Sequence, residues 1–495
     1  MSIFTPELLI EVVELYNPWW KTKSVPNKEK LHFKRNAFYL ARNSLFDKEN
    51  TKGTLLYGIR RIGKATIMYQ LIDELLEKGI SPDNILFFSF DNPIIKIADI
   101  DGMLKTYKKI HKIEGDLNPN EEYYLFIDEI QYSHKIGTIL ADIIKTNPKI
   151  HIVATSSACP EFDKKDTSHH GLFNYIPMNS LSFYEYCELL NLNSKLDFSL
   201  SPNDFVVENT EKITEAHTVL KKTIVPHFKR FLYLGGFPKL ALQSNKPDDI
   251  ALPRADIVSK VVRPDLSSVY NIRNTFQMEK VFLYGSLCSG GVINIERMSK
   301  ELGDMNKISL HNYIHYMRLA NLIQVSEPVP AFGYPIYKSR PKVYMANAAI
   351  RNSILLTDKD EARPHEFNSM IEGEIFKQLS KSFDGQYQQI GYCRNPLGNH
   401  SEIDIMIDFF EYKYLCEVQY LDHVNLSEND LMFEMSNSFR SNAEKSVLVT
   451  KDLSDFGPWY TKTRTPIYRV AAPVYLYMIS KNEREGILAK YDSKK

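Results

Sequence analysis

Apolar residues come in short runs along the first third of the chain, and the stretches between these runs are amphipathic or polar. Four runs, each bounded by polar or turn residues, predict buried strands. After the first run, apolar residues recur at three- and four-residue intervals, as at Ile67, Leu71 and Leu75, which predicts a helix over residues 64–78. Strands that alternate with helices predict a mainly parallel sheet covered by helices. The predicted strands are residues 54–58, 84–91, 123–129 and 149–157.

The first 50 residues precede this pattern and predict a helical segment. Residues 28–46 place Leu31, Phe38 and Leu45 among basic residues, which is typical of an amphipathic helix. Two interpretations of this helix are open. Either it packs on the next domain, or its basic face contacts nucleic acid.

A different rhythm of helices and short strands begins after about residue 270. Apolar periodicity predicts three helices and then two short strands, which together have the helix, turn, helix and hairpin order of a winged-helix domain. A further helix and a set of alternating segments predict a last α/β unit. The predicted helices are residues 281–290, 293–303, 308–323 and 367–383, and the predicted strands are 323–328, 341–347, 388–394, 402–410, 414–420, 445–452 and 473–479.

Charge and cysteine content restrict the class of protein. Lys and Arg together number 61, as do Asp and Glu, so no overall basic excess indicates nucleic-acid binding. The five cysteines are scattered without C-x-x-C spacing, which argues against a zinc site or a disulfide framework. No stretch approaches the ~18 unbroken apolar residues of a membrane span, and the N-terminus lacks signal-peptide features. We therefore expect a cytoplasmic protein with no membrane partner.

A complete G-x-x-x-x-G-K pattern lies in YGIRRIGKAT, residues 57–66, between the first predicted strand and its helix. In such a loop the glycines let backbone N–H groups converge on phosphate oxygens, and the helix N-terminus adds positive potential. We expect Lys64 to reach the β- and γ-phosphates of a nucleotide. The predicted nucleotide-binding residues are Gly58, Arg60, Arg61, Ile62, Gly63, Lys64, Ala65, Thr66 and Ser156.

Two carboxylates directly follow the apolar run of the third predicted strand. We expect Asp128 to hold Mg²⁺ and Glu129 to polarise the water that attacks the nucleotide. The apolar run that leads into them disfavours the alternative, a solvated acidic turn. Ser156, with its neighbours Thr155 and Ser157, ends a strand where ligands bind in open α/β sheets. It is a candidate γ-phosphate sensor, and a plain strand-end cap is the other interpretation.

With these residues in place, the chain resembles prokaryotic AAA-type ATPases that carry a C-terminal DUF4143 region. The resemblance lies in stretches that occur in family order over about residues 50–425, namely YGIRRIGKATIMYQLI, LFIDEIQY, IVATSSA, LSFYEYCEL, LGGFPKLAL, IGYCRN, SEIDIMI and CEVQY. The resemblance implies an α/β P-loop NTPase fold of the AAA+/STAND type with a parallel sheet, a winged-helix domain and a PD-(D/E)xK nuclease-like α/β domain. The expected units are an N-terminal helical segment at 1–50, a P-loop ATPase domain with a helical extension at 51–270, the winged-helix domain at 271–350 and the nuclease-like domain at 351–495.

Nucleases of the PD-(D/E)xK type need acids for Mg²⁺ and a Lys that steadies the attacking water or the transition state. Because side chains alternate along a strand, Glu402 and Asp404 share one face of their strand, and Glu417 and Gln419 share one face of the next. A hairpin would bring the two pairs together. The alternative is a retained scaffold whose acids are solvated or paired with Arg394. The candidate metal ligands are Glu372, Asp404 and Glu417, and the candidate catalytic residues are Asp404, Glu417 and Gln419.

Three departures from the family pattern bear on function. Ala65 stands where Ser or Thr would ligate Mg²⁺, Leu172 where Arg often occurs, and Gln419 where Lys would complete E-x-K. Loss of one Mg²⁺ ligand leaves the backbone cradle and Lys64, so binding of ATP or ADP should survive. Hydrolysis depends on metal placement, and a misplacement of about 1 Å costs on the order of 10²-fold in rate.

Two functional hypotheses follow, and a third, a defence or toxin-like effector whose C-terminal domain cuts nucleic acid once the ATPase releases it, is supported only by the pairing of domains. In the first, the chain is a slow or impaired ATPase that uses ATP and Mg²⁺, and its nucleotide state controls a winged-helix and nuclease-like module acting on DNA. In the second, both active sites are eroded and the chain is a nucleotide-gated module that contacts a protein partner or another copy of itself. The second helix of the predicted winged-helix domain has only Lys307 and Arg318 as firm cations, so it does not favour DNA over protein contact.

Overall fold

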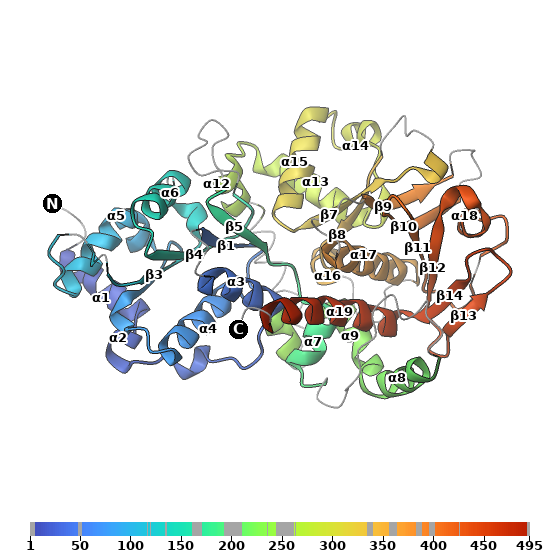
Figure 1. Cartoon of the computed structure of the whole chain (residues 1–495). Coiled ribbons are helices and arrows are strands. Elements are labelled where there is room, and N and C mark those ends of the chain that lie inside the picture. The colour runs from blue at the N-terminus through green and yellow to red at the C-terminus, as the bar shows by residue number, and fades with distance from the viewer. Residues whose placement is uncertain are drawn as a thin grey trace.

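A computed structural model of the chain shows two lobes (Figure 1). The first lobe, drawn from blue to teal, contains the first five strands, and the second, drawn from green to red, contains the remaining strands. The structure describes residues 5–47, 52–115, 117–118, 120–133, 136–160, 171–192, 210–234, 236–243, 262, 264–333, 340–355, 364–382, 389–395, 401–424 and 426–492.

The first lobe is built on a five-stranded sheet in the order β2-β3-β4-β1-β5. Every neighbouring pair in this sheet is parallel, which confirms the sheet predicted from the alternation of strands and helices. The four predicted strands are present, and β5 adds a fifth beside β1. The bounds are β1 (Gly53–Tyr57), β2 (Ile85–Ser89), β3 (Tyr123–Asp128), β4 (Ile150–Ser156), β5 (Phe173–Pro177), α4 (Lys64–Glu77), α5 (Pro93–Ile110) and α6 (Ile136–Thr146).

The strands of this sheet are buried on both faces. In β3, Tyr124 and Phe126 belong to the apolar core shared with α4, whereas Leu125 and Ile127 belong to the core shared with α5 and α6. A strand with helices on both faces reads as one continuous apolar run, and this is the pattern that the sequence shows. The polar residues Asp128 and Glu129 follow where β3 leaves the core.

The N-terminal segment packs on β2, the edge strand of the sheet. The Asn17 side chain donates to the carbonyl of Phe87 and accepts from its amide, at 2.8 and 2.7 Å. The Trp19 indole N–H donates to the Ile85 carbonyl at 3.1 Å. These contacts cover backbone groups that an edge strand otherwise leaves unpaired. The segment comprises α1 (Pro6–Tyr16), α2 (Trp19–Thr22), the short 3-10 helix η1 (Asn27–Glu29) and α3 (Asn36–Phe46).

The helix predicted over residues 28–46 is wrong in its first half, because α3 begins only at Asn36. The reason is a tertiary contact: the Gln70 side chain donates to the carbonyls of Leu31 and Phe33 at 2.9 and 2.8 Å. These carbonyls are therefore bound to α4 outside any helix. The expectation that this segment packs on the next domain is confirmed by Phe38 and Leu45, which are buried in the core shared with α4.

The second lobe begins with helices that follow β5. The side chains of Phe183 and Phe231 lie in the same apolar core as Tyr477 near the C-terminus. The helical extension expected to complete the P-loop domain thus packs into the second lobe. Its helices are α7 (Phe183–Leu189), α8 (Thr210–Thr223), α9 (Val225–Leu234), α10 (Pro238–Leu242) and α12 (Leu266–Tyr270).

A unit of four helices and three short strands comes next. Strands β6 and β7 both pair with β8 in antiparallel fashion. The predicted order of helix, turn, helix and hairpin is present in the chain. The bounds are α13 (Thr275–Leu287), β6 (Gly291–Val292), α14 (Ile295–Glu301), α15 (Lys307–Leu319), β7 (Ile323–Pro328), β8 (Lys342–Met345) and α16 (Ala348–Leu355).

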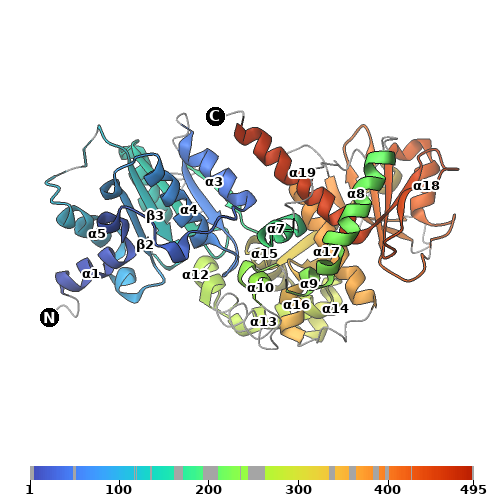
Figure 2. The same ribbon diagram turned by 90° about the horizontal axis from the view of Figure 1, so that it is seen from below.

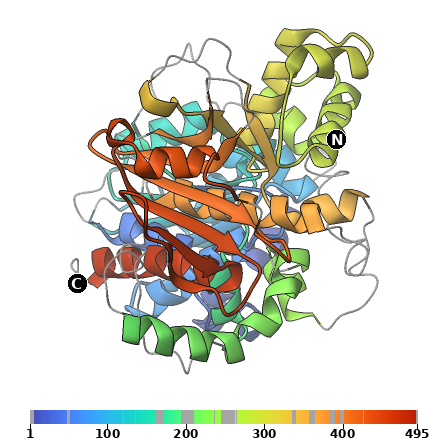
Figure 3. The ribbon, with the colours of Figure 1, turned by 90° about the vertical axis from the view of Figure 1, so that its right-hand side faces the viewer.

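The last unit is a mixed sheet whose orange to red strands face the viewer in Figure 3. Strands β9, β10 and β11 form an antiparallel meander, β12 and β14 continue it in parallel, and β13 closes the edge. Because β7 pairs with β9, the described strands of the second lobe form one nine-stranded sheet, in the order β13-β14-β12-β11-β10-β9-β7-β8-β6. The bounds are α17 (Pro364–Ser382), β9 (Gln389–Arg394), β10 (Glu402–Asp408), β11 (Lys413–Gln419), α18 (Leu431–Asn437), β12 (Ala443–Thr450), β13 (Phe456–Tyr460) and β14 (Ile467–Ala471).

The strand predicted at residues 473–479 is wrong, because this stretch opens the long helix α19 (Ala472–Asp492). Its residues are almost completely buried on all sides, so the apolar run has neither helical nor strand periodicity. Helix α19 runs back from the C-terminal sheet to α3 and α7 of the N-terminal half (Figure 2). There the Arg484 guanidinium donates to the Lys34 carbonyl at 2.6 Å. Among the described residues, we find no helix that is long and apolar enough to cross a membrane.

Candidate functional site

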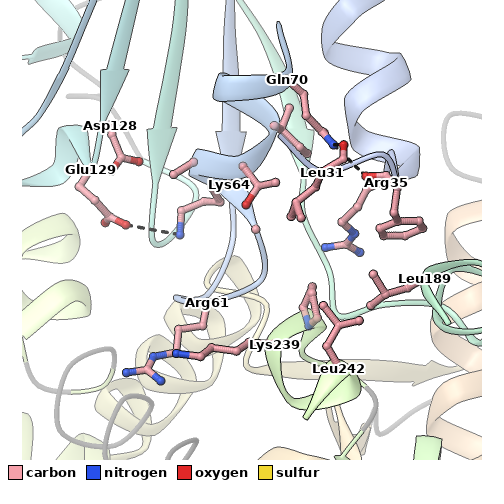
Figure 4. Close-up of a pocket in the computed structure, with 16 residues that line it drawn as sticks. Leu31, Arg35, Arg61, Lys64, Gln70, Asp128, Glu129, Leu189, Lys239 and Leu242 are labelled. Carbon is pink, nitrogen blue, oxygen red and sulfur yellow. Dashed lines mark hydrogen bonds and ion pairs between the residues drawn. The ribbon is translucent and has the colours of Figure 1, made fainter. Parts of the chain in front are cut away.

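A cavity of 440 Å³ lies where the loop after β1 meets the end of β3 (Figure 4). Its walls come from both lobes, because residues of α7 and α10 close the side opposite the loop. The cavity therefore lies at the carboxyl ends of the strands, where open α/β sheets bind ligands. Its lining residues are Leu31, Phe33, Arg35, Arg61, Gly63, Lys64, Ala65, Thr66, Ile67, Gln70, Asp128, Glu129, Leu189, Pro238, Lys239 and Leu242.

The loop from Gly58 to Lys64 needs glycine at both glycine positions of the G-x-x-x-x-G-K pattern. Gly58 has a φ of +154°, and a Cβ on it would meet the Met178 carbonyl oxygen at 2.2 Å. Gly63 has a φ of +96°, in the left-handed region, and α4 begins at the next residue. These two glycines let the loop turn back on itself and direct the N-terminus of α4 at the cavity.

Lys64 is held in place by the loop itself. Its ammonium donates to the carbonyls of Gly58 and Ile59 at 2.8 and 3.2 Å, and it lies 3.6 Å from a carboxylate oxygen of Glu129. The lysine is only 5% exposed. Because water screens so little of its charge, this ammonium is a strong anchor for an anion that enters the cavity.

The two acids at the end of β3 are fixed by the ends of the neighbouring strands β2 and β4. Asp128 accepts from the Thr155 hydroxyl at 2.5 Å and from the Ser89 hydroxyl at 3.0 Å. Glu129 accepts from the Ser157 hydroxyl at 2.8 Å and from the Gln131 amide. The backbone of Glu129 has a φ of +56°, an uncommon conformation that turns its side chain toward Lys64.

The environments of the two acids move their pKa values in opposite directions. Burial and the neighbouring charge of Glu129 raise the pKa of Asp128 to about 6. Burial opposes ionisation of Glu129 too, but Lys64, the Gln131 amide and Arg60 more than offset it, so the pKa of Glu129 lies below its usual value. Glu129 is therefore ionised at neutral pH, as an acceptor for a water proton must be.

The structure brings most of the predicted nucleotide-binding residues to the cavity. Arg61, Gly63, Lys64, Ala65 and Thr66 line it, together with both acids. The Ser156 hydroxyl instead accepts from the Ala158 amide at 3.4 Å, and its neighbours Thr155 and Ser157 contact the acids.

Arg60 turns away from the cavity toward the second lobe. It donates to both carboxylate oxygens of Asp265, at 2.8 and 3.2 Å, and to the Tyr132 hydroxyl at 2.7 Å. Asp265 is fully buried and lies immediately before α12. Sequence reasoning placed Arg60 with the nucleotide, whereas these contacts join the loop to the chain segment that leads into the second lobe.

Arg35 is a site residue that the sequence did not reveal. It donates to the carbonyl of Ile62 in the loop at 2.8 Å and to that of Asn179 at 2.9 Å, and it pairs with the buried carboxylate of Glu185 at 3.0 Å. Arg35 and Glu185 are separated by 150 positions, so no local pattern joins them. Through its contact with the Ile62 carbonyl, Arg35 holds the phosphate loop in position.

The apolar end of the cavity was also missed. Leu31 and Phe33 come from the extended segment before α3, and Leu189 and Leu242 come from α7 and α10. Lys239 adds a cation from the second lobe beside Arg61 (Figure 4). The stretch LGGFPKLAL that carries Lys239 and Leu242 was noticed in the sequence without any role being assigned to it.

The cavity residues fit Mg²⁺ in part. Asp128 offers carboxylate oxygens, the ligands that this ion prefers. Ala65, at the start of α4, has no oxygen to add. A metal ion bound here would keep Asp128 and depend on nucleotide and water oxygens for its remaining positions.

The predicted acids of the C-terminal unit also converge, but around a lysine. The Lys342 ammonium, from β8, lies 2.9 Å from Glu372, 2.8 Å from Glu402 and 3.1 Å from Asp404. The antiparallel pairing of β10 with β11 brings Asp404 to Glu417, as the expected hairpin required, since the Asp404 amide donates to Glu417 at 3.4 Å. Sequence reasoning found these acids and missed Lys342.

The charge balance of this cluster follows from its burial. Burial and Asp404 raise the pKa of Glu372 to about 8, and they also raise the pKa of Glu417 well above its usual range. Burial opposes the charge of Lys342, but Asp404 and Glu372 more than offset it and raise its pKa. Glu402 also pairs with Arg394 at 2.9 Å, as expected if these acids belong to a retained scaffold. Gln419 ends β11 opposite Thr450.

This arrangement does not fit a divalent metal ion. In the part of the chain that the structure describes, no three Asp, Glu, His or Cys side chains are grouped so as to hold one. The Lys342 ammonium fills the space between the carboxylates that were expected to ligate Mg²⁺.

Comparison with known families supports the assignment of the first lobe. Residues 50–187, from just before β1 into α7, match a family described as an AAA domain. This part of the chain is similar to that family, and its parallel sheet and phosphate loop support an AAA-type P-loop domain. Such a domain implies nucleotide binding, usually with Mg²⁺. Residues 225–361, from α9 to just beyond α16, match a domain of unknown function, DUF8612, and not the DUF4143 region that we expected.

The relatives of known sequence give no function. An uncharacterized protein of Methanocaldococcus jannaschii is 29% identical over 43% of this chain and 43% of its own, so the chain spans less than half of it in that match. A second uncharacterized protein of the same organism is 23% identical over 74% of each chain. An uncharacterized protein of Haemophilus influenzae is 20% identical over 60% of this chain and 68% of its own.

Solved structures with a weak overall likeness to this chain include the following three. The Aeropyrum pernix Orc1 protein in complex with DNA covers 68% of this chain and 95% of its own, at 11% identity and a TM-score of 0.27. The Thermotoga maritima RuvB branch migration motor covers 62% and 93%, at 16% identity and a TM-score of 0.26. AMPPCP-bound DnaA from Aquifex aeolicus covers 61% and 92%, at 13% identity and a TM-score of 0.25. At scores this low, nothing about this chain rests on the likeness.

Proposed function

We propose that the chain binds ATP and ADP in the cavity at the P-loop and hydrolyses ATP slowly. The observation that carries the proposal is that Lys64, Glu129 and Ala65 line the same cavity. The first two supply an anchor for phosphate and an ionised acceptor for a water proton. The third removes the hydroxyl that would complete the metal site.

The shape and chemistry of the cavity support a nucleotide as the ligand. Its apolar end, formed by Leu31, Phe33 and Leu242, suits a flat base, and its polar end carries Lys64 and Arg61 for the phosphates. A bound Mg²⁺ would neutralise phosphate charge, with Asp128 as its protein ligand. Glu129 orients the attacking water and accepts its proton. Arg35, in this proposal, is a positioning residue that acts through the Ile62 carbonyl.

For the second lobe we propose a winged-helix unit, α13 to β8, followed by a domain of PD-(D/E)xK nuclease-like topology. The sequence of α17, an antiparallel meander, α18 and a strand parallel to β11 supports the latter assignment. Nucleotide state in the first lobe would control this module through the contacts of Arg60 with Asp265.

For the second lobe, two observations favour a nucleotide-gated interaction module over a module that cuts DNA. Lys342 fills the acid cluster where a nuclease would hold its metal ion. In α15, Lys307 is paired with Glu296 at 3.3 Å, which leaves Arg318 as the firm cation of that helix without a described ion pair. Phosphate backbones are normally met by several cations. We therefore expect the second lobe to contact a protein partner or another copy of the chain.

Equilibrium binding of a fluorescent ATP analogue to the full chain tests the proposal. Lys64→Ala should weaken binding by about 10- to 100-fold, the range of one lost charge-assisted hydrogen bond. Lys105→Ala, on the exposed surface of α5, should leave affinity unchanged. A wild-type chain with no affinity for ATP or ADP at millimolar concentrations would overturn the proposal.

A further inference from the structure

Lys342 is the single cation that the described structure places between the carboxylates of the C-terminal unit. It is 2% exposed, and its three partners come from two different elements, with Glu372 on α17 and both Glu402 and Asp404 on β10. The lysine itself belongs to β8, which pairs with β6 and β7 at the opposite end of the nine-stranded sheet. The contact thus joins two units that the sequence had separated.

The ammonium lies among three carboxylates. A lysine has three N–H donors and no acceptor, and three carboxylate oxygens lie 2.8 to 3.1 Å from its nitrogen. A catalytic lysine must keep a donor for the attacking water or the scissile phosphate. Lys342 donates to Glu372 and Asp404 and is ion-paired with Glu402, so its geometry is that of a counter-ion and not of the lysine missing at Gln419.

The same oxygens cannot serve a divalent ion while Lys342 is present. Mg²⁺ requires oxygens at 2.0–2.1 Å in near-octahedral geometry. An ammonium about 3 Å from those oxygens would lie in the metal's own coordination sphere and repel its charge. Occupancy of the cluster by Lys342 and by a metal ion is therefore mutually exclusive.

We propose that Lys342 is the resident cation of this acid cluster and that it keeps the cluster closed to divalent metal ions. The proposal rests on the nuclease-like topology proposed above.

Hydrogen bonds connect the surroundings of Lys342 with the chain segment that leaves the nucleotide lobe. The connection between β5 and α7 carries Ser180, whose hydroxyl donates to the Ala346 carbonyl one residue after β8, at 3.4 Å. The Lys377 ammonium of α17 donates to the same hydroxyl at 2.9 Å. Ser180 therefore contacts both the residue that follows β8 and the helix that carries Glu372.

Mn²⁺ binding to the full chain, measured by electron paramagnetic resonance without nucleotide, tests the proposal. The three proteins to compare are the wild type, Lys342→Met and Lys342→Met/Asp404→Asn. Removal of a buried positive charge next to the site should tighten Mn²⁺ binding by at least about tenfold, since like charges this close cost several kcal/mol. The gain should disappear in the double variant. A folded Lys342→Met that gains no Mn²⁺ site would overturn the proposal.

A second comparison keeps the test decisive if Lys342→Met does not fold. Wild type and Asp404→Asn should bind Mn²⁺ equally weakly, because Lys342 excludes the ion from both. Mn²⁺ binding by the wild type that Asp404→Asn abolishes would overturn the proposal. ATP binding, measured on the same preparations, reports separately on the proposed function, since Lys342 does not line the P-loop cavity.

Discussion

The Lys64 ammonium and the Glu129 carboxylate lie 3.6 Å apart inside the P-loop cavity. Both groups are buried, and each has further partners: Lys64 donates to two loop carbonyls, and Glu129 accepts from Ser157. An entering phosphate must therefore compete with Glu129 for the lysine. In the proposed function, the residue that activates water thus also weakens the hold on the nucleotide.

Replacing Glu129 should separate these two effects. Glu129→Gln keeps the shape of the side chain and removes a negative charge next to Lys64, so we expect ATP to bind about tenfold more tightly. Phosphate release should fall by about 10²-fold or more, because the water loses its proton acceptor. Glu114→Gln, on an exposed loop, is the control for both assays. Unchanged affinity together with unchanged turnover would show that Glu129 has neither role.

Replacing each of the two adjacent arginines of the loop should affect a different property of the protein. Arg61 lines the cavity, so Arg61→Ala should weaken ATP binding with little effect on stability. Arg60 pairs with the fully buried Asp265, so Arg60→Ala should lower the free energy of unfolding by about 3–5 kcal/mol, because it leaves a buried charge without its partner. Each variant is the control of the other. ATP titration and urea unfolding should give the two results, and a larger loss of ATP affinity in Arg60→Ala would contradict the assignment.

The buried pair of Arg35 and Glu185 should make stability depend on pH. Burial opposes ionisation of Glu185, but Arg35 more than offsets it and lowers the pKa of this carboxyl to about 2. A folded pKa below the unfolded value of 4.5 means that the ionised group stabilises the fold above about pH 4.5. This stabilisation, roughly 3 kcal/mol, is lost as the pH falls toward about 2.

Urea unfolding over a pH series tests this prediction. At pH 7, Glu185→Gln should be less stable than the wild type by about 3 kcal/mol, and the difference should shrink below pH 4.5. The exposed Glu11→Gln should follow the wild type at every pH. A difference between Glu185→Gln and the wild type that stays constant from pH 7 to pH 3 would contradict the assignment of the ion pair.

The parts of the fold that the sequence predicted are those whose signals are local. Strands β1 to β4 are apolar runs. The phosphate loop directly follows β1, and Asp128 and Glu129 stand at the end of β3. Residues 473–479 were misassigned because complete burial removes the periodicity that separates helix from strand. The start of α3 was misplaced because Gln70, far along the chain, binds the carbonyls of the preceding segment.

The missed site residues are all brought in over long sequence distances. Arg35 meets Glu185 across 150 positions, and Lys342 meets Asp404 across 62. Lys342 occurs in PKVYMAN, where alternation predicts a strand but gives no sign of the acids it will meet. Among the three departures from the family pattern, Leu172 is partly buried against the core of the first lobe and does not line the cavity.

ATP turnover by the wild type beside Ala65→Thr tests the central claim most directly. The threonine hydroxyl restores an oxygen at the start of α4, so we expect turnover to rise by about 10²-fold while ATP affinity changes little. Thr66→Ala/Ala65→Thr controls for a simple change in hydroxyl number. Equal turnover by the wild type and Ala65→Thr, at a rate typical of active ATPases, would contradict the claim that this cavity holds nucleotide better than it hydrolyses it.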